Sequence, residues 1–447
     1  MTAAPRNSAA PVTARRVLTL WWPLAGSWLL MGVEMPMLTA AMTRMPGGEP
    51  HLAAIGALVY PLSILIEAPI IMLLAASTAL VKDLATHARL LRFAHLASLL
   101  LTIVHVAVAF TPLYDVIVRD VIGVPAAIVE PGRIGMMLMT PWTWAIGYRR
   151  FQQGVLIRCG RSDLVGVGTI VRLVANVLVL LLGLAVGTWP GIVVGAAAIS
   201  CGVLAEAAWA GWSFRRAARP KLPAEPDGEL ISWRAFAAFY TPLAFTPIIT
   251  IVIQPIGSWA MSKMHAPLQS LAAWPAVYGI VFLSRSAGFA FNEVVVSLAG
   301  EPGGGRALYR VGVGIASVTT AVLTLLALTP LGGVWFAKVS GLSTELTALA
   351  CTSLPLALAM PIYSVAQNYL QGRMVHHKRT RPITEAVVLY LAVCTVCLLA
   401  GMRWLQDLPG IQVTLLAFTV AGLAQTWWLW RSGRGQRDAT PTPQPSA

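Results

Sequence analysis

The residues best placed to do chemistry are ionisable side chains inside long apolar runs. Glu34 and Glu67 lie in the first two of these runs. A charged side chain at the centre of a bilayer costs about 2.5–3.5 kcal/mol on insertion scales, so such groups usually have a role. We expect Glu34 and Glu67 to bind a coupling ion, H⁺ or Na⁺. The alternative is that they hydrogen-bond Asn176 or nearby Ser and Thr side chains and hold helices together.

Two arginines, Arg172 and Arg285, also lie inside apolar runs. A guanidinium is a planar fork that suits phosphate or carboxylate. We therefore expect both residues in a substrate cavity, where they would bind an anionic solute or a lipid pyrophosphate. The alternative is a pair of salt bridges, Arg172 with Glu34 or Glu67 and Arg285 with Glu293.

Further polar side chains in the apolar runs are candidates for the same cavity, although helix–helix hydrogen bonding is their usual use. Glu293 and Asn292 lie near the end of a run, where a cap or a gate is an equal alternative. Glu206 and Glu385 are expected at the membrane interface. The full set of cavity candidates is Arg172, Asn176, Gln254, Arg285, Asn292, Glu293 and Gln367.

The motifs of soluble enzymes and metal sites are missing from the sequence. No G-x-x-x-x-G-K-[ST] loop and no H-E-x-x-H motif is present. His95 and His105 are ten residues apart, which does not place them on one metal-binding helix face. Cys394 and Cys397 lie in an apolar run with no histidine partner. We expect no catalytic residue, no metal site and no cofactor apart from the coupling ion.

Composition decides the class of protein. The chain has 447 residues, of which 57% are hydrophobic and 11% charged, with a mean hydropathy of +0.71. A soluble domain carries about 25% charged residues. Apolar runs longer than about 18 residues recur along the chain, and backbone groups in lipid must be satisfied within a helix. The sequence therefore predicts an all-α integral membrane protein.

Twelve transmembrane helices are predicted, and the basic residues support this number. Lys and Arg in alternate loops and at both ends number 24, against 6 in the other loops, which places both termini in the cytoplasm. The predicted spans are residues 17–43, 52–81, 90–114, 126–156, 163–187, 190–214, 233–262, 267–298, 307–335, 344–372, 382–402 and 410–430.

The chain repeats itself. Pro23-Leu24 and Pro36 recur 219 positions later as Pro242-Leu243 and Pro255. Each half has six spans, so both enter the membrane from the same side and the repeats are parallel. The predicted domains are a cytoplasmic N-tail (1–16), an N-terminal six-helix bundle (17–214), a cytoplasmic linker (215–232), a C-terminal six-helix bundle (233–431) and a disordered C-tail (432–447).

These features resemble the multidrug/oligosaccharidyl-lipid/polysaccharide (MOP) exporter superfamily, which includes the multidrug and toxic compound extruders (MATE). The resemblance rests on the parallel repeat, the W-P-L and T-P-L openings at 22–24 and 241–243, and the Q-G pairs at 153–154 and 371–372. Within the superfamily, the run from Phe239 to Ile256 is similar to the progressive ankylosis family. The resemblance implies a V-shaped pair of bundles and alternating access. It also places Glu34 near the first-span carboxylate, usually Asp, that couples some members to an ion.

The expected function is therefore secondary active export of a small solute, either an organic cation or an anionic metabolite. A lipid-linked oligosaccharide flippase of the same fold is the alternative, and an intramembrane lipid-modifying enzyme is less favoured. We expect a multi-pass monomer in the bacterial inner membrane, whose partners are the lipid bilayer and a small-molecule substrate and not a nucleic acid.

Overall fold

The computed structural model describes residues 11–224, 232–377 and 379–434, so parts of the predicted tails and linker lie outside the described residues. Regular structure in these ranges is helical. The N-terminal half holds α1 (Ala14–Met42), α2 (Gly48–Ala53), η1 (Ala54–Val59), α3 (Tyr60–Ile71), α4 (Leu73–Leu80), α5 (Leu84–Phe110), α6 (Leu113–Asp115), η2 (Val116–Ile122), α7 (Ala126–Arg158), α8 (Ser162–Val186), α9 (Gly191–Ser213), η3 (Phe214–Ala218) and η4 (Arg219–Lys221).

The C-terminal half repeats this order. It holds α10 (Trp233–Ile251), α11 (Ile253–Ser262), α12 (Pro267–Leu298), α13 (Gly304–Leu328), α14 (Pro330–Val334), η5 (Trp335–Val339), α15 (Thr344–Ser353), η6 (Leu354–Ala357), α16 (Met360–His376), α17 (Arg381–Trp404) and α18 (Gly410–Arg434).

Eleven helical segments of the described chain are long and apolar enough to cross a membrane. They coincide with eleven of the predicted spans. The remaining predicted span corresponds to α7, a helix of 33 residues that carries several charged side chains. The prediction of a multi-pass helical membrane protein is confirmed, while the number of crossings and the side of the termini stay predictions.

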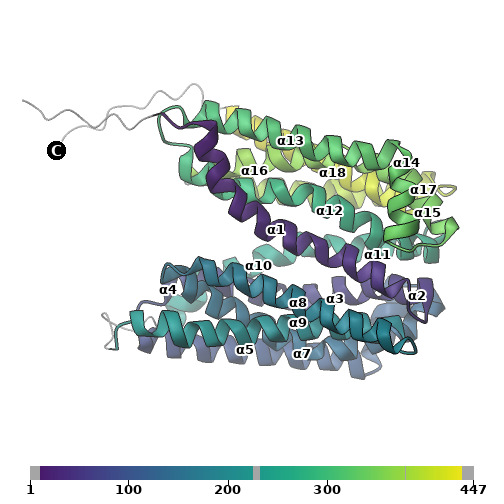
Figure 1. Ribbon diagram of the computed structural model, residues 1–447, viewed down its shortest axis with the longest axis horizontal. Coiled ribbons are helices and arrows are strands. Elements are labelled where there is room, and N and C mark those ends of the chain that lie inside the picture. The colour runs from purple at the N-terminus through teal and green to yellow at the C-terminus, as the bar shows by residue number, and fades with distance from the viewer. Residues whose placement is uncertain (1–10, 225–231, 378, 435–447) are drawn as a thin grey trace, which may run out of the picture.

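The helices form two bundles that meet in a V (Figure 1). The ribbons of the bundles converge near α2, α11 and α15 and diverge toward α4 and the start of α13. Side chains join the loops at the converging end. Thr43 Oγ1 donates to the Ser340 carbonyl at 2.6 Å, and Arg44 Nη2 donates to the Lys338 carbonyl at 2.6 Å. We refer to this end, marked by Thr43 and Ser340, as the closed end.

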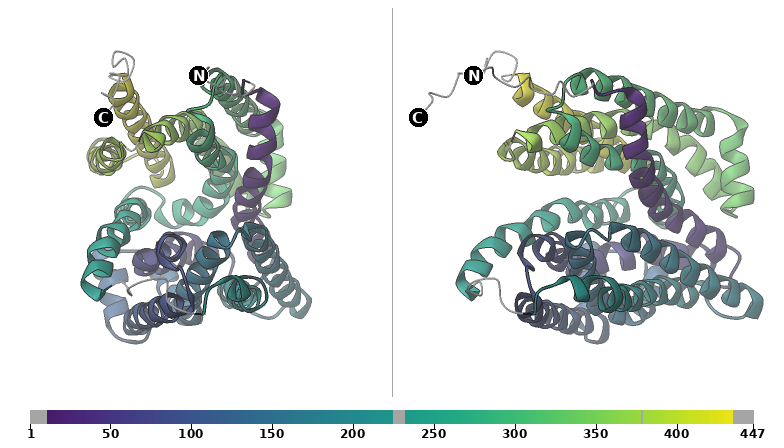
Figure 2. Two further views of the ribbon diagram at one scale, coloured as in Figure 1. Left: turned by 90° about the vertical axis from the view of Figure 1, so that its left-hand side faces the viewer. Right: turned by 60° about the vertical axis from the view of Figure 1, so that its left-hand side comes forward.

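The first helix of each half crosses to the other bundle. The beginning of α1 contacts α12, where Trp21 Nε1 donates to the Ala287 carbonyl at 2.9 Å. The beginning of α10 contacts α3, where the Tyr240 hydroxyl donates to the Pro69 carbonyl at 2.7 Å. Figure 2 (left) shows α1 and the teal α10 on opposite flanks of the molecule. These two helices tie the bundles together at the diverging end.

Capping residues show why the two halves fold alike. Thr13 and Ser232, 219 positions apart, are the N-caps of α1 and α10, and each hydroxyl accepts a hydrogen bond from the backbone N–H three residues on. An N-cap of this kind contributes about 1 kcal/mol. Thr111 and Thr329, 218 positions apart, follow α5 and α13, and each precedes Pro-Leu. The same local signals at a near-constant offset therefore begin and end the same helices in each half.

Candidate functional site: a charged cavity between the bundles

The carboxylate of Glu34 is neutralised by its neighbours. Arg172 on α8 places Nη2 2.9 Å from Glu34 Oε2, and Asn176, one turn further along α8, donates to Glu34 Oε1 at 2.7 Å. The Arg172 side chain is 7% exposed and the Glu34 side chain 12% exposed, so water screens the pair little. Of the two alternatives for Arg172, the structure shows the salt bridge, and it also places the pair on a cavity wall.

Glu206 is a member of this network that the sequence analysis placed wrongly. We expected it at the membrane interface, but its side chain is 2% exposed inside the N-terminal bundle. Its carboxylate accepts hydrogen bonds from Arg149 Nη1 and, at 2.9 Å, from Gln153 Nε2. Arg172 Nε lies 3.9 Å from Glu206 Oε2. Glu206 therefore links α7 to the Glu34–Arg172 pair.

Arg149 and Arg150 were also misjudged. The count of 24 basic residues on the cytoplasmic side includes both, but both lie within α7, whose helix continues to Arg158. Arg149 is 4% exposed, and it pairs with Glu206. Arg150 lines the same pocket, and no ion pair joins it to another described residue. The signal in the sequence for a buried position was the Arg149-Arg150 pair, followed by Gln153. Two charges this far before the end of a long helix cannot both reach its end.

Glu67 on α3 differs from Glu34 because no basic side chain among the described residues forms an ion pair with it. Its side chain is buried, at 1% exposure, and its Oε1 has no hydrogen-bond partner. The hydroxyl of Thr143 on α7 interacts with this carboxylate. That hydroxyl in turn lies 2.8 Å from Nδ1 of His105. Glu67 is thus a buried carboxylate that forms no ion pair with another described residue.

Two cavities bring the predicted coupling residues together. One, of about 100 Å³ inside the N-terminal bundle, is lined by Glu34 and Glu67 and by Arg149, Arg150 and Arg172. The other, of about 230 Å³, lies between the bundles. The cavities share a wall made of Met31, Glu34, Tyr60, Ile64 and Arg172.

The C-terminal bundle supplies an aromatic wall to the larger cavity. Trp274 and Tyr278 on α12 stack with ring centroids 4.9 Å apart, and Phe282 lies one turn further on. Gln254 on α11 also lines the cavity, and its Nε2 donates to the Tyr278 hydroxyl at 2.9 Å. The cavity is therefore charged on the N-terminal side and aromatic on the C-terminal side.

Arg285 lies beyond this wall. Its guanidinium carbon is 5.4 Å from the ring centroid of Phe289 and 5.5 Å from that of Tyr363, both within cation–π range. The alternative salt bridge with Glu293 is not formed, and Glu293 is exposed. Arg285 therefore interacts with aromatic faces and does not line either of the two cavities described above.

The remaining candidates hold helices together. Asn292 Nδ2 donates to the Asn368 carbonyl at 3.2 Å, which joins α12 to α16. Gln367 Nε2 donates to the Gly422 carbonyl at 2.9 Å, which joins α16 to α18. Neither Asn292 nor Gln367 lines either of the two cavities. Their observed contacts are the hydrogen bonds between helices that were the alternative to a cavity role.

The described residues hold no group of three or more His, Cys, Asp or Glu side chains placed to bind a metal ion. His105 has both ring nitrogens engaged, one with Thr143 and the other with the Met136 carbonyl at 3.0 Å. Cys394 and Cys397 are free thiols. The contacts of His105 join α5 to α7 within the N-terminal bundle.

Comparison with known proteins rests on solved structures. No family model and no curated protein matches the chain. The inward-facing conformation of a multidrug resistance MATE family transporter of the MOP superfamily superposes with a TM-score of 0.67 at 13% identity, covering 96% of this chain and 100% of that one. Its outward-facing conformation gives 0.63 at 12% identity, with 96% and 98% covered. A Vibrio cholerae MATE transporter gives 0.64 at 17% identity, with the same coverage.

The chain therefore has the fold of the MATE transporters of the MOP superfamily, as its sequence pattern indicated. The similar structures are transporters rather than enzymes. At these identities the likeness extends to the fold, and the assignment of a substrate rests on the cavity itself.

Proposed function

We propose that this chain is a secondary transporter that exports a small organic solute by alternating access, with H⁺ as the coupling ion and Glu67 as its carrier. The observation that carries the proposal is the position of Glu67. It is a buried carboxylate without a basic partner, on a cavity that shares a wall with the space between the bundles. The loops that meet at the closed end support a state accessible from the other end.

Glu67 is a better proton carrier than Glu34 because the Glu34 carboxylate already forms an ion pair with Arg172. Releasing Glu34 would leave the buried Arg172 with only its longer contact to Glu206, at 3.9 Å, and breaking a buried pair costs about 3–5 kcal/mol. Protonating Glu67 breaks no ion pair between described residues. We prefer H⁺ to Na⁺ because the pocket around Glu67 is lined by three arginines, Arg149, Arg150 and Arg172, which would repel a metal cation, and because Ile64, Ile71 and Trp142 supply no oxygen ligand.

The best-supported solute is an amphipathic organic cation. Tyr60, Trp274 and Tyr278 present aromatic rings to the larger cavity, and a cation over such a face gains about 0.5–2 kcal/mol. A cation that reaches from the larger cavity past the shared wall into the smaller one would compete with the proton for the Glu67 carboxylate. Competition of this kind produces antiport, because a proton entering from one side releases the cation on the other.

A second candidate is an anionic solute, and Arg150 supports it. Arg150 lines the smaller cavity and has no ion pair with another described residue. An acidic solute bound there would be favoured by protonation of Glu67 rather than opposed by it. Anion and proton would therefore move in the same direction, opposite to the prediction for a cation.

Reconstituted vesicles with an imposed pH gradient distinguish these outcomes. We expect uptake of a fluorescent organic cation against the proton flow, and we expect Glu67→Gln to abolish gradient-driven uptake and to remove the competition between proton and cation, so that cation binding no longer depends on pH. Glu345→Gln, which removes an exposed carboxylate, is the matched control. Co-movement of protons with an acidic solute would establish the second candidate, and full gradient-driven transport by Glu67→Gln would remove the proposed carrier.

We further propose that the protein acts as a monomer in the bacterial inner membrane, without a cofactor and without enzymatic activity. The eleven apolar helices support a multi-pass membrane protein. The distribution of basic residues supports cytoplasmic termini.

A further inference from the structure

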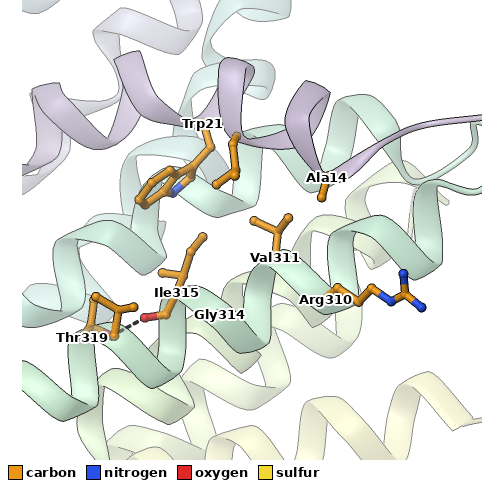
Figure 3. A pocket seen from close by; sticks show the side chains of 9 residues that line it. Ala14, Trp21, Arg310, Val311, Gly314, Ile315 and Thr319 are labelled. Atoms are coloured by element: carbon orange, nitrogen blue, oxygen red, sulfur yellow. Dashed lines mark hydrogen bonds between the residues drawn. The ribbon is translucent and has the colours of Figure 1, made fainter.

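A groove between α1 and α13 lies outside the cavity described above. It has a volume of about 430 Å³ and is lined by Ala14, Leu18, Trp21, Arg310, Val311, Gly314, Ile315, Val318 and Thr319. Figure 3 shows the indole of Trp21 over the surface of α13 and the Arg310 guanidinium at the other end, directed away from the apolar part. The groove is therefore apolar along its length and basic at one end.

The groove is on the outside of the helical bundle. Leu18 is 44% exposed and Val318 is 64% exposed. In a membrane protein, exposed apolar side chains of a spanning helix face lipid. From Arg310 to Thr319 the groove extends nine residues along α13, or about 14 Å at 1.5 Å per residue. That length is close to one leaflet of a hydrocarbon core about 30 Å thick.

The basic end matches an anionic headgroup. Arg310 lines the groove, Arg306 precedes it by one turn of α13, and Arg15 lies on the first turn of α1. All three are exposed, and none forms an ion pair with another described residue. The neighbouring Arg16 is already engaged by Glu301 at 2.6 Å. A lipid phosphate at the end of the groove would therefore meet the Arg310 guanidinium, which is free to pair with it, while Arg306 and Arg15 add positive charge to the same ends of α13 and α1.

The repeat shows that this groove is particular to one half. Sequence positions equivalent to Ala14 and Val311 are Trp233 and Phe93, at offsets of 219 and 218. In the half without the groove, both aromatic residues lie against the ring of Phe236. The ring centroid of Phe236 is 4.6 Å from that of Phe93 and 6.4 Å from that of Trp233. The corresponding positions beside α1 hold Ala14 and Val311, so these two rings are missing from the groove.

We propose that the α1–α13 groove is a binding site for one anionic phospholipid, with an acyl chain along Gly314 and Val318 and the phosphate at Arg310. The start of α1 crosses to the C-terminal bundle at this place, so a bound lipid also packs the crossing segment against α13. The proposal does not depend on the solute or on Glu67.

The test measures lipid binding to the purified full-length chain by native mass spectrometry. Phosphatidylglycerol and phosphatidylcholine with the same acyl chains are titrated separately, and glycerol phosphate reports any chain-free anion binding. We expect one phosphatidylglycerol to be retained at concentrations where phosphatidylcholine and glycerol phosphate are not. Arg310→Gln should weaken phosphatidylglycerol binding about fivefold, the factor for one basic residue near an anionic lipid.

Matched variants come from the repeat itself. Arg92→Gln removes the exposed arginine equivalent to Arg310 in the half without the groove, and should leave binding unchanged. The double change Ala14→Trp with Val311→Phe copies the filled half and should abolish retention of the lipid. Val313→Phe adds the same ring at an exposed position of α13 outside the groove, and should not.

Equal binding of the two lipids by the wild type, or an unchanged lipid preference in Arg310→Gln, would overturn the proposal. Retention of phosphatidylglycerol by a filled variant with the thermal midpoint of the wild type would also overturn it. If the filled variant does not fold, the Arg310→Gln and Arg92→Gln pair decides the question alone. Binding of glycerol phosphate as tightly as the lipid would show a phosphate site without an acyl-chain groove, which also contradicts the proposal.

Discussion

Gly56 on η1 and Pro275 on α12 both line the larger cavity, and Gly56→Ala should shift the balance between conformations. A Cβ at Gly56 would lie 2.0 Å from Cγ of Pro275 on α12, whereas ordinary van der Waals contact begins near 3.4 Å. The bundles would have to separate locally by about 1.4 Å, the difference between these two distances. The proline ring cannot rotate away as a flexible side chain would, so the added methyl group must move a helix.

The magnitude follows from the cost of overpacking. Inserting a methyl group into a packed contact costs about 1–3 kcal/mol, provided that the contact persists. A conformation in which the closed end opens would escape this cost. Gly56→Ala should therefore move the equilibrium toward that conformation by about 5- to 150-fold, the factor that corresponds to such an energy.

Pulsed electron paramagnetic resonance between spin labels measures this shift. Labels at Asp120 and Glu345 report the separation of the bundles near the closed end, because both side chains are exposed. We expect Gly56→Ala to increase the population with the longer distance. Gly26→Ala on α1 is the control, since a Cβ there meets no atom within 4 Å. An unchanged distance distribution in Gly56→Ala would refute the steric reasoning and the closed-end assignment of this contact.

Two further predictions concern stability. Glu206→Gln should lower the free energy of unfolding by about 3–5 kcal/mol, because Arg149 would lose its buried counter-ion, and unfolding of the detergent-solubilised protein measures this loss. Exposed Glu345→Gln should not change it, and an equal loss in both variants would contradict the argument. At the closed end, hydrogen bonds from Arg133 and then Arg119 lower the pKa of Asp115 below its usual range. A lowered folded-state pKa contributes stability above the unfolded value of about 3.9 and loses it as pH falls through the folded value. The thermal midpoint of Asp115→Asn should therefore fall less than that of the wild type between pH 5 and pH 3, and parallel curves would exclude the contribution.

The fold could be predicted from the sequence because it is determined by features that are local or periodic. Apolar length fixes each spanning helix, and basic residues mark the loops. The repeat from Pro23 to Pro242 then indicates that one bundle occurs twice. None of these signals depends on which side chains meet in space, so they could be interpreted without coordinates.

The candidate site was predictable only in part, because it depends on which helix faces meet. Glu34 and Glu67 stood out as charges in apolar runs, and they do line one cavity. Glu206 was misplaced because its run ends soon after it, and closeness to a helix end suggests an interface. Sequence position does not show that α7 brings Arg149 against Glu206, so that the two charges neutralise each other inside the bundle.

The repeat also explains where function can reside. An exact duplication would give both bundles the same cavity wall, yet Glu34 has no counterpart carboxylate: the equivalent position holds Ile253, next to Gln254. Its ion pair with Arg172 therefore places charge on one side of the cavity only, facing the stacked rings of Trp274 and Tyr278. Because each side of the cavity belongs to a different bundle, relative movement of the bundles changes the distance between the charged wall and the aromatic wall. A solute that contacts both walls must then be bound with different strength in each conformation, which is the condition for a ligand to shift such an equilibrium.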